Sequence, residues 1–228
     1  MIEKPILTPD EAAERVRSGD HVMVGGFLGC GSPHTLIQAL KARGTNQLTL
    51  ICNDSGLHDF KTGRIYGVAH LVAQRQCQKI ITSHIGLNQE TQRQMNAGET
   101  TVELVPQGTL AERIRAAGAG LGGFLTPTGI GTEVEAGKNR ILVDNRAYLL
   151  ELPLKADVAL IKAQKADRAG NLVYAATARN FNPLMATAAA LVIAEVEEIV
   201  PIGAIDPNHV HTPSIFVDAL VLSQAQEG

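Results

Sequence analysis

The chain has 228 residues with a formal net charge of −3, and 45% of its residues are apolar. This composition is typical of a globular protein with a sizeable core, and the length favours one domain over residues 1–228. The slight acidic balance, the 4% aromatic content and the lack of Trp argue against nucleic-acid binding. Apolar runs are shorter than the roughly 18 residues that span a bilayer, so we expect no membrane contact.

The cysteines and histidines are scattered, which argues against two further kinds of site. Cys30, Cys52 and Cys77 form no Cys-x-x-Cys pair, and the histidines show no metal-ligand spacing. We therefore expect no metal and no disulfide framework, and we interpret Cys30 as a small buried thiol. Because Met1–Pro5 lacks the charged-then-apolar pattern of a signal peptide, we expect a cytoplasmic location.

The first elements along the chain lead into a glycine-rich turn. Thr8–Glu11 predicts a helix start with a capping box and with proline at the first helical position. Val22–Val24 predicts a buried strand, after which the turn Gly25–Gly31 contains four glycines. Ser32 and Pro33 predict the N-cap and the first position of the next helix. Backbone N–H groups at such a turn suit an anionic ligand, but a plain tight turn explains these residues equally well.

Strands, turns and helices then alternate at a spacing of about 25 residues. This rhythm is typical of a parallel sheet with helices on both faces, in which the strand ends gather the binding site. We predict buried strands at 48–52, 79–83 and 101–105, and helices at 33–42, 88–97 (polar and exposed) and 109–117.

The alternation stops at residue 118. Gly118–Gly123 has the spacing of a dinucleotide-binding motif, but it follows a helix rather than a strand, so we interpret it as a structural loop. Asp144–Arg146 predicts the turn of a hairpin. We further predict buried strands at 158–161 and 191–196, a buried helix at 182–190, and a last strand or helix at 216–222.

Two amides at predicted strand ends are candidates for chemistry. Gln107 lies between Pro106 and Gly108, and Asn53 ends the second strand of the alternating series. Either side chain could donate to an oxyanion, yet both are common in turns, which is the simpler interpretation from spacing alone. We expect the carboxylates of Glu133, Glu135 and Glu151 to be solvated. The residues alone therefore predict an α/β domain that binds an anionic or carbonyl-bearing molecule, with no evident nucleophile.

Six motifs occur across almost the whole chain: Gly25–Pro33, Ser83–Asn88, Val105–Arg115, Gly118–Thr132, Lys165–Asn171 and Ala178–Asn182. Together they resemble the family I coenzyme A transferases, and most of all the alpha subunit of the acetate/acetoacetate (3-oxoacid) type. The resemblance implies an α/β fold, a three-layer α/β/α sandwich with a mostly parallel sheet.

The resemblance also implies that this chain is half of an enzyme. A partner beta subunit would carry the nucleophilic glutamate in a Ser-Glu-Asn-Gly-type motif, which this sequence lacks. The complex would move coenzyme A between a short-chain acyl-CoA and a carboxylic acid by a ping-pong mechanism. No cofactor would be bound permanently, because the coenzyme A thioester is a substrate. The resemblance leaves open the acyl group and the choice between heterodimer and heterotetramer.

Site residues follow from the same resemblance. Gln107 would donate to the oxyanion. A substrate pocket would be lined by Gly25, Gly26, Phe27, Gly29, Gly31 and Asn53. Two alternatives on a related fold remain: a non-catalytic module that binds sugar phosphates or small anions, and a sugar-phosphate isomerase with its own acid/base pair.

Overall fold

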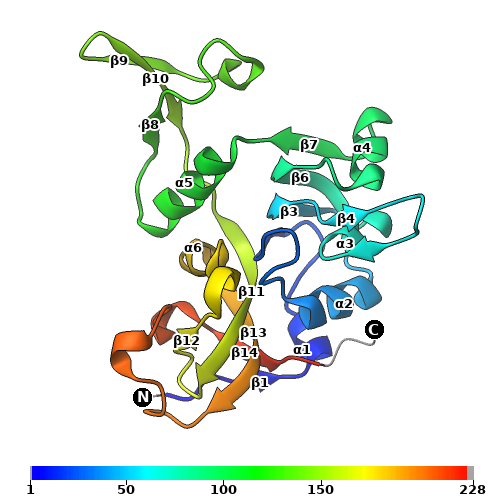
Figure 1. Ribbon diagram of the computed structural model, residues 1–228, viewed down its shortest axis with the longest axis vertical. Coiled ribbons are helices and arrows are strands. Elements are labelled where there is room, and N and C mark those ends of the chain that lie inside the picture. Colours follow the sequence, from blue (N-terminus) through cyan, green and yellow to red (C-terminus); the bar gives the residue numbers. More distant parts are fainter. Residues whose placement is uncertain (1, 225–228) are drawn as a thin grey trace.

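The computed structural model describes residues 2–224. Its main sheet has nine strands in the order β1-β14-β13-β11-β2-β3-β6-β7, with β12 beside β11 (Figure 1). All neighbours along this order are parallel, and only β12 runs antiparallel to its partner. The strands are β1 (Ile6–Leu7), β2 (His21–Val24), β3 (Leu48–Asp54), β6 (Cys77–His84), β7 (Thr101–Leu104), β11 (Ala156–Asp167), β12 (Leu172–Val173), β13 (Ala189–Val200) and β14 (Ala219–Leu222).

Helices cover both faces of this sheet. Successive residues of a strand point to opposite faces, so Val22 and Met23 belong to different core clusters. The cluster around Val22 includes side chains of α1 (Pro9–Ala13), α2 (His34–Arg43) and α3 (Ala69–Ala73). The cluster around Met23 includes side chains of α5 (Gln107–Gly118) and α6 (Asn182–Thr187). The predicted three-layer sandwich with a mostly parallel sheet is confirmed.

The helix starts show how far local sequence decides the boundaries. The capping box of α1 is present: the Thr8 backbone N–H donates to Glu11 Oε2 (2.8 Å), and the Glu11 N–H donates to Thr8 Oγ1 (3.2 Å). The predicted cap of α2 is wrong, because Pro33 is the N-cap residue and no side chain of its own segment caps the helix. Instead the Leu36 N–H donates to Oε2 of Glu195, which comes from distant β13 (3.2 Å).

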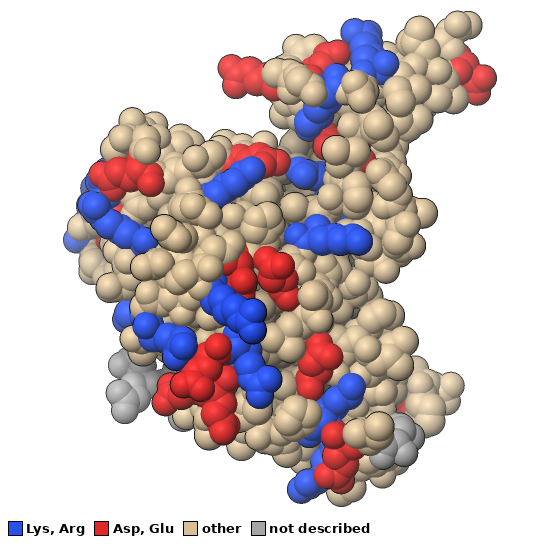
Figure 2. All heavy atoms as spheres, turned by 180° about the vertical axis from the view of Figure 1, so that it is seen from behind, with Lys and Arg blue, Asp and Glu red and all other residues tan. Residues whose placement is uncertain are grey.

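A second, three-stranded sheet stands clear of the sandwich in both overall views (Figures 1 and 2). We call residues 124–151, which contain it, the arm. Its order is β8-β10-β9, with β8 at Phe124–Thr126, β9 at Arg140–Val143 and β10 at Arg146–Glu151. The predicted hairpin is confirmed: Asp144 and Asn145 have φ values of +49° and +61°, as a two-residue turn between twisted strands requires.

Several strands and helices have bounds that differ from the predictions. The strand predicted at 158–161 is the much longer β11, and the helix predicted at 109–117 begins at Gln107. The carboxylate of Glu151 is buried and paired with Lys138 Nζ at 2.5 Å, so its predicted solvation is wrong. The remaining elements are β4 (Leu57–His58), β5 (Ile65–Tyr66), α4 (Gln89–Asn96) and four short 3-10 helices at Glu133–Glu135, Ala176–Arg179, Pro207–His209 and Ser214–Phe216.

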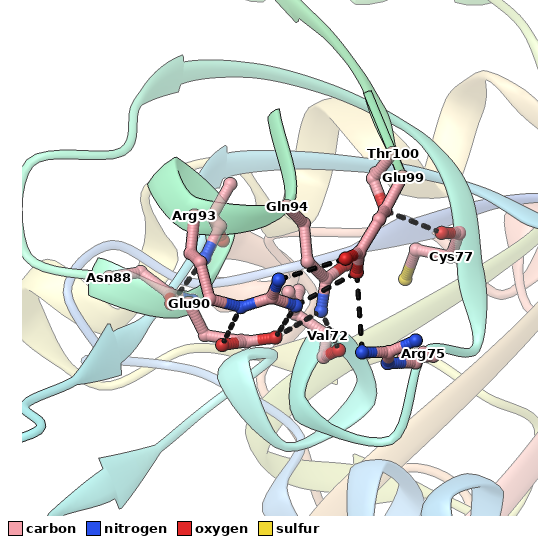
Figure 3. A network of polar contacts seen from close by, with 10 residues as sticks. Val72, Arg75, Cys77, Asn88, Glu90, Arg93, Gln94, Glu99 and Thr100 are labelled. Atoms are coloured by element: carbon pink, nitrogen blue, oxygen red, sulfur yellow. Dashed lines mark hydrogen bonds and ion pairs between the residues drawn. The ribbon is translucent and has the colours of Figure 1, made fainter. Parts of the chain in front are cut away.

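Helix α4 is held by polar contacts rather than by an apolar stripe (Figure 3). Arg93 pairs with Glu90 of the same helix at 2.7 Å and with Glu99, which precedes β7, at 2.8 Å. Gln94 is buried: its Nε2 donates to the Val72 carbonyl (2.8 Å) and its Oε1 accepts from Thr100 (2.7 Å). The expectation of an exposed helix is therefore wrong, because its polar residues Thr91 and Gln94 are buried.

We expect Arg93→Ala to lower the free energy of unfolding at neutral pH, because Glu90 and Glu99 both lose their ion-pair partner. Hydrogen bonds from Arg93 lower the pKa of Glu90 from 4.5 to about 2, although burial opposes the shift, and they also lower the pKa of Glu99. Carboxyls with a lowered pKa stabilise the fold above about pH 4.5 and lose this contribution as the pH falls toward 2. Urea unfolding at several pH values should therefore show the difference from wild type shrinking with acid.

Arg115→Ala is the matched control, because among residues 2–224 Arg115 pairs only with Glu112, one turn away on the same helix. An exposed ion pair within one helix contributes little to stability, so this variant should unfold almost like wild type. A difference for Arg93→Ala that stays constant between neutral and acid pH would contradict the ion-pair explanation.

Candidate active site

The sheet has a topological switch point between β2 and β11, where the order of the strands reverses its direction. Chain order runs outward from β2 through β3, β6 and β7 on one side, while β11, β13 and β14 continue on the other. In open α/β sheets ligands bind outside the carboxyl ends of the strands at such a point. We call the loop that leaves β2 here, residues 25–31, the glycine loop. Asn53 is the penultimate residue of β3, next to β2, and Gln107 follows β7 at the same carboxyl edge of the sheet.

Backbone contacts pull the glycine loop tightly against the C-terminal half of the chain. The Gly25 N–H donates to the Leu160 carbonyl (2.9 Å). A Cβ on Gly25 would lie 1.8 Å from Oδ1 of Asn182, and one on Gly31 would lie 2.5 Å from the Ala178 carbonyl. Asn182 fills this space with three hydrogen bonds: its Nδ2 donates to the Gly31 and Ala178 carbonyls, and its Oδ1 accepts from the Lys162 N–H. The glycines are therefore needed for close packing.

The tip of the loop is a two-residue turn. Phe27 and Cys30 exchange backbone hydrogen bonds of 3.0 and 2.9 Å. Leu28 and Gly29, between them, have φ values of +46° and +83°. This turn exposes Phe27, Leu28 and Cys30 to solvent, so the prediction that Cys30 is a buried thiol is wrong. Gly25 and Gly26 are buried beneath it.

A chain of hydrogen bonds joins the glycine loop to the two candidate amides. Asp54, at the end of β3, accepts at Oδ2 from the Leu28 N–H and from Asn53 Nδ2, both at 2.8 Å. Its Oδ1 accepts from the Gly56 N–H at 3.1 Å. Asn53 Oδ1 accepts from Nε2 of Gln107 at 3.1 Å. The structure thus brings together Gln107, Asn53 and the glycine loop, although they lie far apart in the sequence.

Gln107 and Asn53 differ in exposure. Gln107 is the first residue of α5 and is exposed, whereas Asn53 is only 3% exposed. Asn53 is also anchored by its backbone carbonyl, which accepts from the hydroxyls of Thr82 (3.1 Å) and Ser83 (2.7 Å). A substrate at this edge can therefore reach the Gln107 amide more readily than the Asn53 amide.

A pocket of about 310 Å³ lies on the other side of the glycine loop. Gly29 and Gly31 line it together with His34 of α2, Tyr66 of β5 and Lys162 of β11. His34 Nε2 and the Tyr66 hydroxyl are 2.5 Å apart. Burial lowers the pKa of His34, although the carboxylate of Glu195 opposes this shift, so this residue is neutral at physiological pH.

Charged residues form the floor of this pocket. Lys162 Nζ lies 3.2 Å from Glu195 Oε1 and 2.6 Å from the Ser223 hydroxyl, and Ser223 donates to Glu195 at 3.0 Å. Because Glu195 also accepts from the Leu36 N–H at the start of α2, the pair fixes that helix against β11 and β13. Sequence reasoning missed Lys162, Glu195, Asp54 and Asn182. A lysine and a glutamate inside the apolar runs 158–163 and 191–196 are the signal that indicates a buried pair.

Among residues 2–224, no group of three or more His, Cys, Asp or Glu side chains could hold a metal ion. Within the same range, no helix is long and apolar enough to cross a membrane.

Comparison with known proteins gives the class to which this fold and site belong. The family model described as Coenzyme A transferase matches residues 6–223. The chain belongs to the coenzyme A transferase family.

Particular relatives cover nearly all of the chain. It is 48% identical over 219 residues to the alpha subunit of the acetate CoA-transferase of Escherichia coli, covering 96% of this chain and 97% of that protein. It is 46% identical over 224 residues to one subunit of the probable succinyl-CoA:3-ketoacid coenzyme A transferase of Bacillus subtilis, covering 98% and 92%. The crystal structure of glutaconate coenzyme A-transferase from Acidaminococcus fermentans superposes with a TM-score of 0.83 at 22% identity, over 96% of this chain and 75% of that one. This last likeness shows the fold.

Proposed function

We propose that this chain is the alpha subunit of a heteromeric CoA-transferase acting on short-chain acids of the acetate, acetoacetate, butyrate or succinate type. The family membership and the names of the two relatives, which are single subunits of such enzymes, support this assignment. A third relative, 44% identical over 209 residues, is the acetoacetyl-CoA:acetate/butyrate CoA transferase alpha subunit of Clostridium acetobutylicum. The free thiols of Cys30, Cys52 and Cys77 support a reducing, cytoplasmic compartment.

The observation that carries the proposal is the exposed amide of Gln107. Its Nε2 donates one hydrogen to Asn53, and an amide nitrogen has two. Among the described residues the second hydrogen has no acceptor, so it is available to a ligand at the carboxyl edge of the sheet. A fixed donor beside a thioester carbonyl stabilises the negative charge that builds on that oxygen during nucleophilic attack.

The nucleophile in this proposal is a glutamate of the beta subunit. Asp54 is the carboxylate that the Gln107–Asn53 chain reaches, and its oxygens accept from three N–H groups. It is also buried, so it serves as an anchor and is not free to attack. We propose that the partner supplies the missing carboxylate from a Ser-Glu-Asn-Gly-type motif.

The reaction then proceeds in four balanced steps. The partner's glutamate attacks the acyl-CoA carbonyl, and the coenzyme A thiolate leaves to give an acyl-glutamyl anhydride. The thiolate attacks the glutamyl carbonyl and releases the first carboxylate, which leaves a glutamyl-CoA thioester. A second carboxylate attacks this thioester and displaces the thiolate to form a new anhydride. The thiolate then attacks the acyl carbonyl of this anhydride, which gives the new acyl-CoA and releases the glutamate carboxylate. Covalent intermediates of this kind predict ping-pong kinetics. Gln107 donates to the oxyanion at the substrate carbonyl, and coenzyme A is a substrate rather than a resident cofactor.

The glycine loop would form one wall of the substrate site. Gly29 and Gly31 lie on the 310 Å³ pocket, and Phe27 is exposed beside them. Gly25 and Gly26 are buried, so their part in this proposal is to let the loop pack closely rather than to touch the substrate.

The test is transfer of coenzyme A from acetyl-CoA to acetoacetate by the purified chain, alone and after reconstitution with its beta subunit. We expect activity only from the mixture. Activity of the chain alone would overturn the half-enzyme proposal, and Glu133, Glu135 and Glu151 would then be mutated to find the nucleophile. Stable assembly without transfer to any short-chain acid would instead favour a non-catalytic anion-binding module.

A further inference from the structure

The hydrogen bonds around Asn53 have a fixed direction, and Asp54 sets it. An ionised carboxylate can only accept, and Asp54 accepts from two backbone N–H groups in addition to the Asn53 side chain. The end of the Asn53 amide that faces Asp54 must therefore be the NH2 group. Its carbonyl oxygen, Oδ1, must then face the other way.

Gln107 stands at that other end. Because Asn53 Oδ1 can only accept, the atom of Gln107 that lies 3.1 Å away must be the donor Nε2. If both amides were flipped, the Asn53 oxygen would face the Asp54 carboxylate and Gln107 would turn its own oxygen toward Asn53. The Gln107 oxygen would then occupy the position beside Asn53, and its NH2 group would be turned away from that position.

We propose that Asn53 and Asp54 are positioning residues that lock Gln107 as a hydrogen-bond donor. This inference rests on the proposed function of Gln107 and deepens it. It also changes the role of Asn53 from a residue that touches the substrate to one that acts through Gln107. Burial supports this change, because Asn53 is 3% exposed and both ends of its amide have protein partners.

A double-mutant cycle on the assembled enzyme tests the proposal. Gln107→Ala removes the hydrogen-bond donor. Asn53→Leu removes the amide that positions this donor while keeping a side chain of similar size. We expect kcat to fall about 100-fold in the first variant and about 10-fold in the second. In the double variant kcat should match that of Gln107→Ala alone, because Asn53 acts only by positioning the Gln107 amide, which is already absent. The KM for the carboxylate should stay within about threefold in all three.

Several other results would overturn the proposal. If the fold-losses of kcat in the two single variants multiply in the double variant, Asn53 acts independently of Gln107. A raised KM at unchanged kcat for Asn53→Leu would mean that Asn53 touches the substrate. A wild-type kcat for Gln107→Ala would contradict the proposed function itself. A reduced kcat for Gln107→Ala together with a wild-type kcat for Asn53→Leu would contradict only the positioning role of Asn53.

Substitutions at Asp54 keep the proposal testable if Asn53→Leu does not fold. In Asp54→Asn the amide can keep its oxygen toward Leu28 and Asn53, where two donors meet, and loses only the hydrogen bond from the Gly56 N–H, so kcat should stay within about threefold of wild type. Asp54→Ala removes the carboxylate that orients the Asn53 amide, so it should lower kcat. In the Gln107→Ala background the same substitution should not lower kcat further. If Asp54→Asn and Asp54→Ala slow the enzyme equally, and additively with Gln107→Ala, the carboxylate is merely structural.

Discussion

Replacing Gln107 by alanine is expected to lower kcat of the assembled enzyme about 100-fold while leaving the subunits associated. Removing one donor from an oxyanion site typically costs about 10²–10³ in rate. The fold should tolerate the change, because Gln107 is an exposed first residue of α5 and, within the described part of the chain, its side chain hydrogen-bonds to Asn53 alone. Steady-state kinetics with acetyl-CoA and acetoacetate, together with size-exclusion chromatography, would measure both effects.

Gln89→Ala provides a matched control. Gln89 is also an exposed glutamine at the first position of a helix, and its side chain also makes one hydrogen bond, to the Phe60 N–H. It lies on α4, away from the glycine loop, so kcat should stay at the wild-type value. Equal kcat values for the Gln107 and Gln89 variants would remove Gln107 from the catalytic machinery.

Gly25→Ala is expected to have the largest effect on stability, about 3 kcal/mol. The added methyl group would lie 1.8 Å from Oδ1 of Asn182, a side chain held by three hydrogen bonds. Either those bonds break or the glycine loop moves, and both outcomes cost stability. For a chain of this length the melting temperature should fall by roughly 6–12 °C. Thermal unfolding followed by circular dichroism would measure it.

Gly122→Ala is the control for a general effect of replacing glycine. No atom of residues 2–224 lies within 4 Å of a Cβ built on Gly122, and its φ is not in the left-handed region. This variant should melt within about 2 °C of wild type, or slightly higher, because alanine restricts the unfolded chain. A wild-type melting temperature for Gly25→Ala would mean that Asn182 moves aside freely.

Patterns that depend on neighbouring residues were predictable from the sequence. The capping box at Thr8, the hairpin turn at Asp144 and Asn145, and the alternating strands and helices all follow from local preferences, and the structure contains them. The family was predictable as well, because its motifs are long and occur together.

Features that depend on contacts between distant residues were not predictable in the same way. The start of α2 is fixed by Glu195 on another strand, so Ser32 looked like a cap without being one. The role of Asp54 depends on meeting Leu28, 26 positions earlier, and Gln107 meets Asn53 across 54 positions. Spacing places such residues at one edge of the sheet, but only the three-dimensional structure shows which atoms pair.

The junction of β2 with β11 has a consequence for how the protein is made. His21 of β2 donates to Asp157, which is 136 positions later, and Gly25 of the glycine loop donates to Leu160. At a synthesis rate of roughly 5–20 residues per second, the ribosome adds the partner strand on the order of 10 s after β2. Until then one edge of β2 is open, and an open strand edge can pair with other chains. The nascent N-terminal half therefore passes through an aggregation-sensitive interval, and the substrate wall becomes rigid only when the second half of the polypeptide arrives.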